Sequence, residues 1–225
     1  IENAKSADAQ TRWMGGTGLN RGNLQYFSKV SKLGHAIIPD LWLKNKRLRE
    51  DLRNPSAHLD TLNEVAWLGR WIQPTNIQRN FRLRGEEGNS HDIDWRFTVA
   101  GGLHINLEVK RRPCDLQRHL GRKNADPQKL FSDVVEKFRP GKNDELNVLG
   151  LTLFGQVDRE VQEVTAAWLK EQHVVDAVLL WSFESRAKSA FDRHVVSSKR
   201  ELLKLVVKEP DEEDLSLIFQ VQVVV

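Results

Sequence analysis

The stretch that decides the fold is HDIDWRFTVAGGLHINLEVKR, residues 91–111. It contains two runs in which every second residue is apolar, and this period of two is typical of strands with one buried face. The apolar residues are Ile93, Trp95, Phe97 and Val99 in the first run, and Leu103, Ile105, Leu107 and Val109 in the second. Between the runs lie Ala100, Gly101 and Gly102, and glycine accepts the positive φ of tight turns. The stretch therefore predicts a β-hairpin.

The other face of this predicted hairpin is polar. It carries Asp92, Asp94 and Arg96 on the first strand, and Asn106, Glu108 and Lys110 on the second. If the loop has an odd length, Asp94 lies across from Glu108, and directly opposed residues have Cβ atoms about 4.5–5.5 Å apart. Two carboxylates at that distance repel each other unless a cation lies between them, and oxygen ligands suit a divalent metal. The pattern predicts a metal site at Asp94 and Glu108. We expect Asp92 across from Lys110, whose stem packs on no core.

The spacing of these charged residues has a counterpart in a known family. Asp94, a gap of thirteen residues and then the triplet Glu-Val-Lys at 108–110 resemble the motif of the PD-(D/E)XK nuclease superfamily. Ile93 replaces the proline of that motif if Asp94 is the ligand, and His91 replaces it if Asp92 is. The alternative is a solvated polar face on an amphipathic hairpin.

The predicted order of elements agrees with that superfamily. The periodicity predicts a helix over 57–72 with Ser56 as N-cap, a strand at 77–83, the hairpin, a helix from Pro127 to Phe138, strands at 146–154 and 174–183, and a helix over 158–172 between those strands. Strands joined through a helix run parallel. We therefore expect an α/β fold with a restriction-endonuclease-like αβββαβ core, in which helices flank a mixed central sheet.

The chain length of 225 residues suits one large domain with appendages. We expect a helical N-terminal extension over 1–53, with helices at 23–34 and 40–53, and the nuclease-like core over 54–185. A C-terminal helix and strand extension of the same domain is expected over 186–225, with strands at Leu202–Val207 and Leu215–Val225.

Composition excludes several classes of protein. A single cysteine, Cys114, permits neither an internal disulfide framework nor a cysteine zinc site. No apolar run approaches the roughly 18 residues of a membrane span, and no secretory signal is recognisable. We expect a cytoplasmic protein with no membrane partner, and we leave a homodimer open. The net charge is only +3, so a nucleic-acid partner has to be inferred from local basic clusters.

The resemblance implies a nuclease that uses Mg²⁺ or Mn²⁺. Its ligands would be Asp94, Glu108 and Glu64, with Asp92 as a further candidate, because the first core helix of the superfamily often carries a glutamate that reaches the metal. Lys110 would orient the attacking water or stabilise the developing negative charge. Asp94, Glu108, Lys110 and Glu64 are thus the expected catalytic residues.

A basic segment follows the second hairpin strand. Its charged residues are Arg111, Arg112, Arg118, Arg122 and Lys123, and we expect them to contact phosphates, of DNA rather than RNA. Two alternatives remain open: a catalytically silent module of the same fold that binds nucleic acid or protein, and an RNase toxin domain that uses the same residues.

Overall fold

The computed structural model describes residues 38–54, 56–83, 92–112, 128–154, 159–183, 203, 206–207 and 219–224. The chain divides into two compact units, Ile1–Gly69 and Arg70–Val225. The boundary expected from sequence, at residue 54, precedes the helix at 58–68, whereas this division follows that helix.

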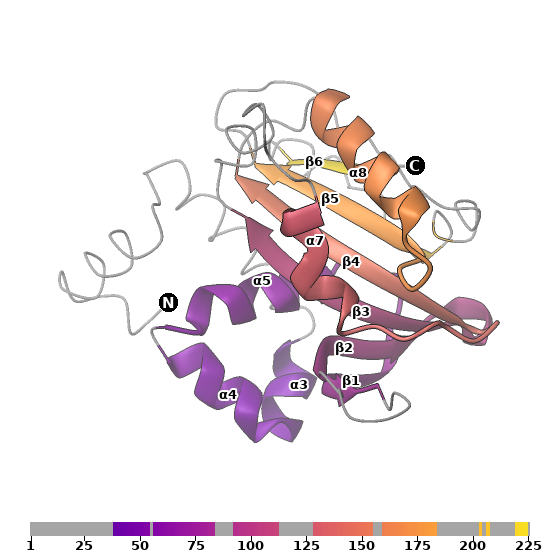
Figure 1. The fold of residues 1–225 in the computed structure, drawn as a ribbon. Coiled ribbons are helices and arrows are strands. Elements are labelled where there is room, and N and C mark those ends of the chain that lie inside the picture. Colours follow the sequence, from indigo (N-terminus) through magenta and orange to yellow (C-terminus); the bar gives the residue numbers. More distant parts are fainter. Residues whose placement is uncertain are drawn as a thin grey trace, which may run out of the picture. The chain divides into compact units, whose positions relative to one another are not determined.

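The described part of the first unit is helical (Figure 1). It contains α3 (Ile38–Lys44), α4 (Lys46–Arg53) and α5 (His58–Leu68). Asn45 Oδ1 accepts a hydrogen bond from Leu48 N at 2.9 Å and caps α4, so the single helix expected over 40–53 is interrupted there. The expected N-cap of α5 is wrong, because Ala57 holds that position and Ser56 Oγ donates to Asn54 Oδ1 at 2.8 Å. The helix expected at 23–34 lies outside the described residues.

A six-stranded mixed sheet with the order β1-β2-β3-β4-β5-β6 is the framework of the second unit (Figure 1). The strands are β1 (Thr75–Arg82), β2 (Asp92–Thr98), β3 (His104–Arg112), β4 (Glu145–Phe154), β5 (Ala177–Phe183) and β6 (Phe219–Val224). The neighbours β3, β4 and β5 run parallel, and the other pairs are antiparallel. Two helices, α7 (Gln128–Val135) and α8 (Arg159–Glu171), lie in the connections between the parallel strands. The expected α/β class, with helices flanking a mixed sheet, is confirmed.

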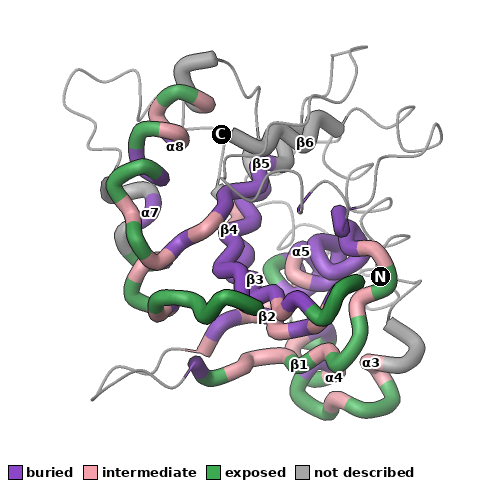
Figure 2. The backbone as a smooth tube through the Cα atoms, turned by 90° about the vertical axis from the view of Figure 1, so that its right-hand side faces the viewer, coloured by how far each residue is buried: buried purple, intermediate pink, exposed green. Residues whose placement is uncertain are grey.

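The predicted hairpin is confirmed as β2 and β3. Trp95 pairs with Leu107 and Thr98 with His104, so the loop between residues 98 and 104 has the expected odd length. Gly101 and Gly102 have φ values of 81° and 79°, a conformation that suits glycine. Burial alternates along β2, but β3 is buried almost throughout, as the purple path through β3, β4 and β5 in Figure 2 shows.

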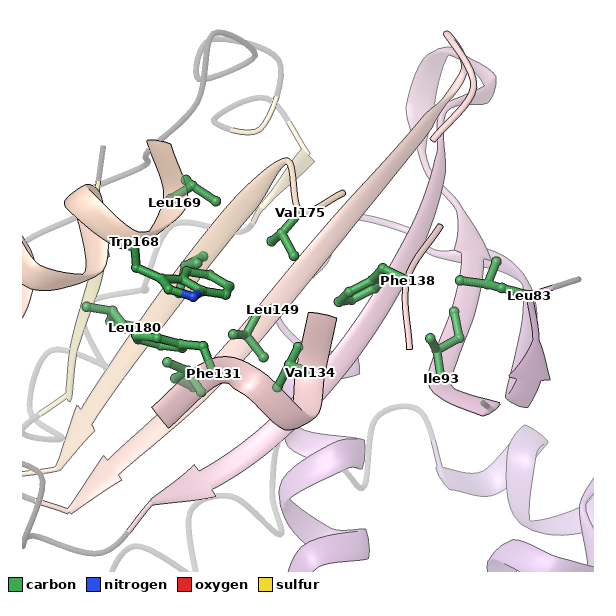
Figure 3. Close-up of a cluster of buried hydrophobic side chains, with 12 residues drawn as sticks. Leu83, Ile93, Phe131, Val134, Phe138, Leu149, Trp168, Leu169, Val175 and Leu180 are labelled. Atoms are coloured by element: carbon green, nitrogen blue, oxygen red, sulfur yellow. The ribbon is translucent and has the colours of Figure 1, made fainter. Parts of the chain in front are cut away.

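An apolar cluster covers one face of β4 and β5 (Figure 3). Leu149 of β4 and Leu180 of β5 pack there with side chains from both crossover helices. The rings of Phe131 on α7 and Trp168 on α8 stack with centroids 4.2 Å apart. Because one cluster contains residues of both helices, α7 and α8 lie on the same side of the sheet.

The first strand of the sheet is irregular. Its pairing with β2 shifts register between Thr75 and Gln78, and Asn76 and Asn80 have positive φ values of 51° and 52°. No residue of β1 is fully buried. As the outermost strand in the order, β1 has one edge without a neighbour among the described strands.

The C-terminal strands differ from the expectation. Leu203 and Val206 are helical, so the strand expected at Leu202–Val207 is wrong, and Val207 forms only an isolated bridge to Trp71. The strand expected at Leu215–Val225 is present as β6, and it extends the central sheet beside β5. Within the described chain, no helix combines the length and the apolar character needed to cross a membrane.

The apolar cluster can be tested with two neighbouring valines of α7. Val134 is fully buried, whereas Val135 is only partly buried against the cluster. Val134→Ala should lower the free energy of unfolding by about 1.5–2.5 kcal/mol through reduced burial and a cavity. Val135→Ala, which changes helix propensity equally, should lower it by less than about 1 kcal/mol. Equal effects of the two variants in chemical denaturation would contradict the assigned packing of α7.

Candidate active site

Glu108 on β3 has a fully buried side chain, although glutamate is almost never fully buried unless paired. Its Oε1 atom lies 2.9 Å from Lys110 Nζ and 2.5 Å from Lys137 Nζ. Its Oε2 atom is buried and has no hydrogen-bond partner within the described part of the chain. One oxygen of this carboxylate is therefore compensated by two ammonium groups, while the other is unsatisfied.

The surroundings of Glu108 follow from its place in the sheet. The β3–β4 register sets Glu108 beside Leu149, on the face that the α7 side of the cluster covers. After α7 the chain turns, with Lys137 N donating to Val134 O at 3.0 Å. The next residue, Phe138, is buried in the cluster and holds the turn against the sheet. Sequence reasoning missed Lys137, whose one signal was its place beside the last apolar residue of the predicted helix.

Asp94 directly precedes Trp95, which pairs with Leu107 on β3. Continuing this register by one residue sets Asp94 opposite Glu108, as expected. Asp94 Oδ2 accepts a hydrogen bond from Val109 N at 2.7 Å, so the carboxylate takes up a main-chain donor of β3. Its charge also acts on Lys110. The structure thus brings three of the expected site residues together.

Lys110 is held by several acids. Burial by itself lowers the pKa of this amine, but the charge and hydrogen bond of Glu108, with the charges of Asp94 and Asp133, outweigh it and raise the pKa of Lys110. Asp133 Oδ2 lies 3.9 Å from Nζ. The Lys110 side chain is 22% exposed. The raised pKa means that the amine is protonated at neutral pH.

The remaining expected acids lie in other surroundings. Continuing the β2–β3 register sets Asp92 opposite Lys110, as expected, and Asp92 Oδ1 lies 3.3 Å from Arg82 Nε of β1 in an ion pair. Glu64 is partly buried on α5, in the first unit, and its metal role stays a prediction.

Of the expected phosphate-binding residues, Arg111 is partly buried near the end of β3, and Arg112 ends that strand. Arg118, Arg122 and Lys123 lie outside the described residues.

The acids around Glu108 fit a hard divalent cation. Magnesium keeps several water ligands and is commonly bound through one or two carboxylates. Asp94 and Glu108 supply two carboxylates from adjacent strands, and Glu108 Oε2 is a buried acceptor without a hydrogen-bond partner. Among the described residues, no group of three or more histidine, cysteine, aspartate or glutamate side chains gathers to hold a metal. The described side chains therefore fit an ion held by two carboxylates.

A second polar cluster lies at the start of β4, and sequence reasoning assigned it no role. Glu145 Oε1 is 2.8 Å from Arg96 Nη2, and its Oε2 is 3.3 Å from Arg139 Nη2. Arg96 also donates to Asn106 Oδ1 at 2.7 Å, and Asn106 Nδ2 donates to Asn147 Oδ1 at 2.8 Å. Burial alone raises the pKa of Glu145, but the hydrogen bond from Arg96 and the neighbouring charges outweigh it and lower the pKa. These bonds join β2, β3 and β4 beside Glu108.

A scan against protein-family models, a search of curated proteins and a search of solved structures each find no match to this chain. We therefore infer a function for Glu108 and its neighbours from the chemistry of their side chains.

The second polar cluster gives a prediction about pH. Because the pKa of Glu145 is lowered in the folded chain, its ion pairs stabilise the fold above the ordinary glutamate pKa and lose this effect as the pH falls through the lowered value. Glu145→Gln should cost about 1.5–3 kcal/mol of unfolding free energy at neutral pH, and the difference from wild type should shrink in acid. Denaturation measured from pH 7 to pH 3 tests this.

A matched control is Glu136→Gln, at an exposed glutamate of the same unit. That variant should follow the wild-type pH profile. A deficit of Glu145→Gln that stays constant across the acid range would show that the charge of Glu145 is not what stabilises the cluster.

Proposed function

We propose that the second unit is a metal-dependent nuclease that hydrolyses phosphodiester bonds, with DNA rather than RNA as substrate. The observation that carries the proposal is the buried carboxylate of Glu108, which has Lys110 on one oxygen and, among the residues that the structure describes, no hydrogen-bond partner on the other. Asp94 adds a second carboxylate from the adjacent strand. Two acids and a lysine in this arrangement are what the PD-(D/E)XK resemblance implies.

The order of the strands also supports the proposal. The antiparallel run β1-β2-β3, the crossover through α7 and the parallel strand β4 agree with the βββαβ part of a restriction-endonuclease-like core. That topology, with α5 as the preceding helix, is part of the proposal. The strands β5 and β6 would then be additions to it.

The roles of the side chains follow from their charges. A bound Mg²⁺ or Mn²⁺ supplies a Lewis acid and lowers the pKa of a water ligand. Asp94 and Glu108 would hold that ion, and a ligand role for Glu64, which lies in the first unit, stays a prediction. The raised pKa of Lys110 makes it a donor and a positive charge rather than a general base. Lys110 therefore stabilises negative charge at the phosphate and positions the attacking water.

Between the two aspartates considered as the main ligand, the contacts favour Asp94. Asp94 is hydrogen-bonded to Val109, the residue after Glu108, whereas Asp92 is paired with Arg82 on the other neighbouring strand. Asp94 is therefore the proposed ligand, preceded by Ile93 in place of the proline of the motif.

A catalytically silent module is the competing function. The two ammonium groups on Glu108 Oε1 favour it, because a carboxylate paired in this way also serves as a purely structural ion cluster. Such a module would bind nucleic acid or protein without cleaving a phosphodiester. An RNase toxin domain would use the same side chains on RNA.

The decisive variant is Lys110→Met, which keeps an unbranched apolar stem but removes the terminal ammonium group and its charge. Glu108 retains Lys137 as a partner, so the variant should fold. It should still bind Mn²⁺ because Asp94 and Glu108 are unchanged. Cleavage should fall by about 10²–10³ because a preorganised electrostatic group is removed. Plasmid DNA, single-stranded DNA and tRNA digested with Mg²⁺, Mn²⁺ or EDTA give the readout, and Lys142→Met, at an exposed lysine, is the control.

Three results separate the functions. Metal-dependent cleavage of DNA that Lys110→Met abolishes supports the nuclease, and the same pattern on tRNA alone supports the RNase. If Lys110→Met cleaves nucleic acid at the wild-type rate, the match of residues 108–110 to the nuclease motif is a coincidence. A wild-type chain that cleaves none of the substrates would be a silent module.

The basic end of β3 tests the nucleic-acid partner separately from cleavage. Replacing both Arg111 and Arg112 with glutamine should reduce the salt dependence of DNA binding by about 0.9 in slope for each phosphate that the protein no longer neutralises. The control is Arg82→Gln, at an exposed arginine of β1, which should leave the salt dependence of DNA binding unchanged. Binding is measured in EDTA at several salt concentrations, and an unchanged slope would remove Arg111 and Arg112 from the interface.

A further inference from the structure

Lys137 has a position that the proposed reaction does not explain. Its Nζ atom lies 2.5 Å from Glu108 Oε1, and its side chain is 22% exposed. Lys137 also donates a hydrogen bond to this carboxylate. The proposed metal ligand thus already holds the ammonium group of a side chain from a different element of the fold.

The two lysines on Glu108 are held differently. Lys110 lies on β3, and the charges of Asp94 and Asp133 also act on it. Lys137 lies in the turn after α7, and it reaches Glu108 from outside the sheet. Lys110 has a role in the proposed reaction, whereas Lys137 has none, so Lys137 is the amine whose departure from Glu108 would leave the proposed catalytic residues in place.

The backbone around Lys137 is fixed, so its amine can move without unfolding the turn. Its own N–H donates to Val134 O at 3.0 Å, and the following residue, Phe138, is buried in the apolar cluster. One residue further on, Arg139 O accepts a hydrogen bond from Asn147 Nδ2 at 2.6 Å. The lysine side chain itself is a flexible four-carbon stem, which can carry the ammonium group away from Glu108.

The oxygens of Glu108 set the competition. A carboxylate has about four lone-pair positions over its two oxygens, and both lysines use those of Oε1. A divalent ion that binds Glu108 is repelled by the ammonium groups of Lys110 and Lys137. If the Lys137 ammonium group moves away, the repulsion between the metal and its surroundings falls. The charge that Lys137 supplies to the buried carboxylate is the charge that a bound metal would supply instead.

We propose that Lys137 is the resident counter-cation of the metal-free site, and that it competes with the divalent metal for Glu108. Binding of the metal is then coupled to the departure of the Lys137 ammonium group, and Lys137 sets the metal affinity of the site. This inference rests on the proposed function because it requires a metal at Glu108.

The test is calorimetric titration of Mn²⁺ into the full chain, compared between wild type and Lys137→Met. The methionine keeps an unbranched apolar stem and removes the competing charge, so we expect Mn²⁺ to bind about tenfold or more tightly, which corresponds to about 1.4 kcal/mol. Lys142→Met, which removes a charge from an exposed lysine before β4, should leave the affinity unchanged. Lys137→Gln, which retains a hydrogen-bond donor, provides a second neutral variant.

Thermal unfolding gives a readout that does not depend on cleavage. In EDTA, Lys137→Met should unfold at a lower temperature than wild type, because Glu108 then has only one of its two counter-charges. Added Mn²⁺ should raise the unfolding temperature of the variant more than that of wild type, because tighter binding to the folded state stabilises it more.

Each result decides between the proposals. Equal or weaker Mn²⁺ binding by both neutral variants, with wild type still binding, would overturn the role of Lys137 alone. Absence of Mn²⁺ binding from wild type and both variants would overturn this inference together with the metal-dependent function. Tighter binding by the variants in a chain that cleaves no nucleic acid would uphold the competition and overturn the nuclease.

Discussion

The constraint on which this structure depends is the burial of the Glu108 carboxylate in the middle of a sheet. An unpaired charge in that position is too costly to keep, so cations must reach it from its own strand and from the neighbouring helix layer. Lys110 meets the first requirement through its place two residues along β3, and Lys137 meets the second through the turn after α7. The packing of Phe138 in the apolar cluster therefore also serves the ion pair, because it holds the neighbouring Lys137 next to the Glu108 carboxylate.

The polar face of the hairpin is divided between two tasks. Towards the start of β4, Arg96, Asn106 and Glu145 satisfy one another, and their bonds give that end a fixed arrangement. Towards the other end, Glu108 Oε2 has no hydrogen-bond partner among the described residues. The hydrogen bonds of Arg96, Asn106 and Glu145 thus join the strands next to the buried acid.

The sequence predicted the hairpin well because its information is local. The alternation from Ile93 to Val109 and the glycines between the strands determine the pairing, and with it the position of Asp94 beside Glu108. Lys137 and Glu145 could not be found in this way. Their contacts with Glu108 and Arg96 join residues 29 and 49 positions apart in the chain, and no period within one element reports such a distance. The strand expected at Leu202–Val207 was wrong because apolar content alone does not distinguish a strand from a short helical segment.

The irregular first strand has a consequence for assembly. A long, flat edge strand offers a row of free amides and carbonyls to any other extended chain, and natural proteins prevent this with bulges, twists and charges. In β1, the register shift near Thr75 and the left-handed conformations of Asn76 and Asn80 interrupt that row at short intervals. A second chain laid along β1 would find few consecutive partners. The sheet is therefore protected against growth from this side, and crowded copies of the protein should resist fibre-like stacking through β1.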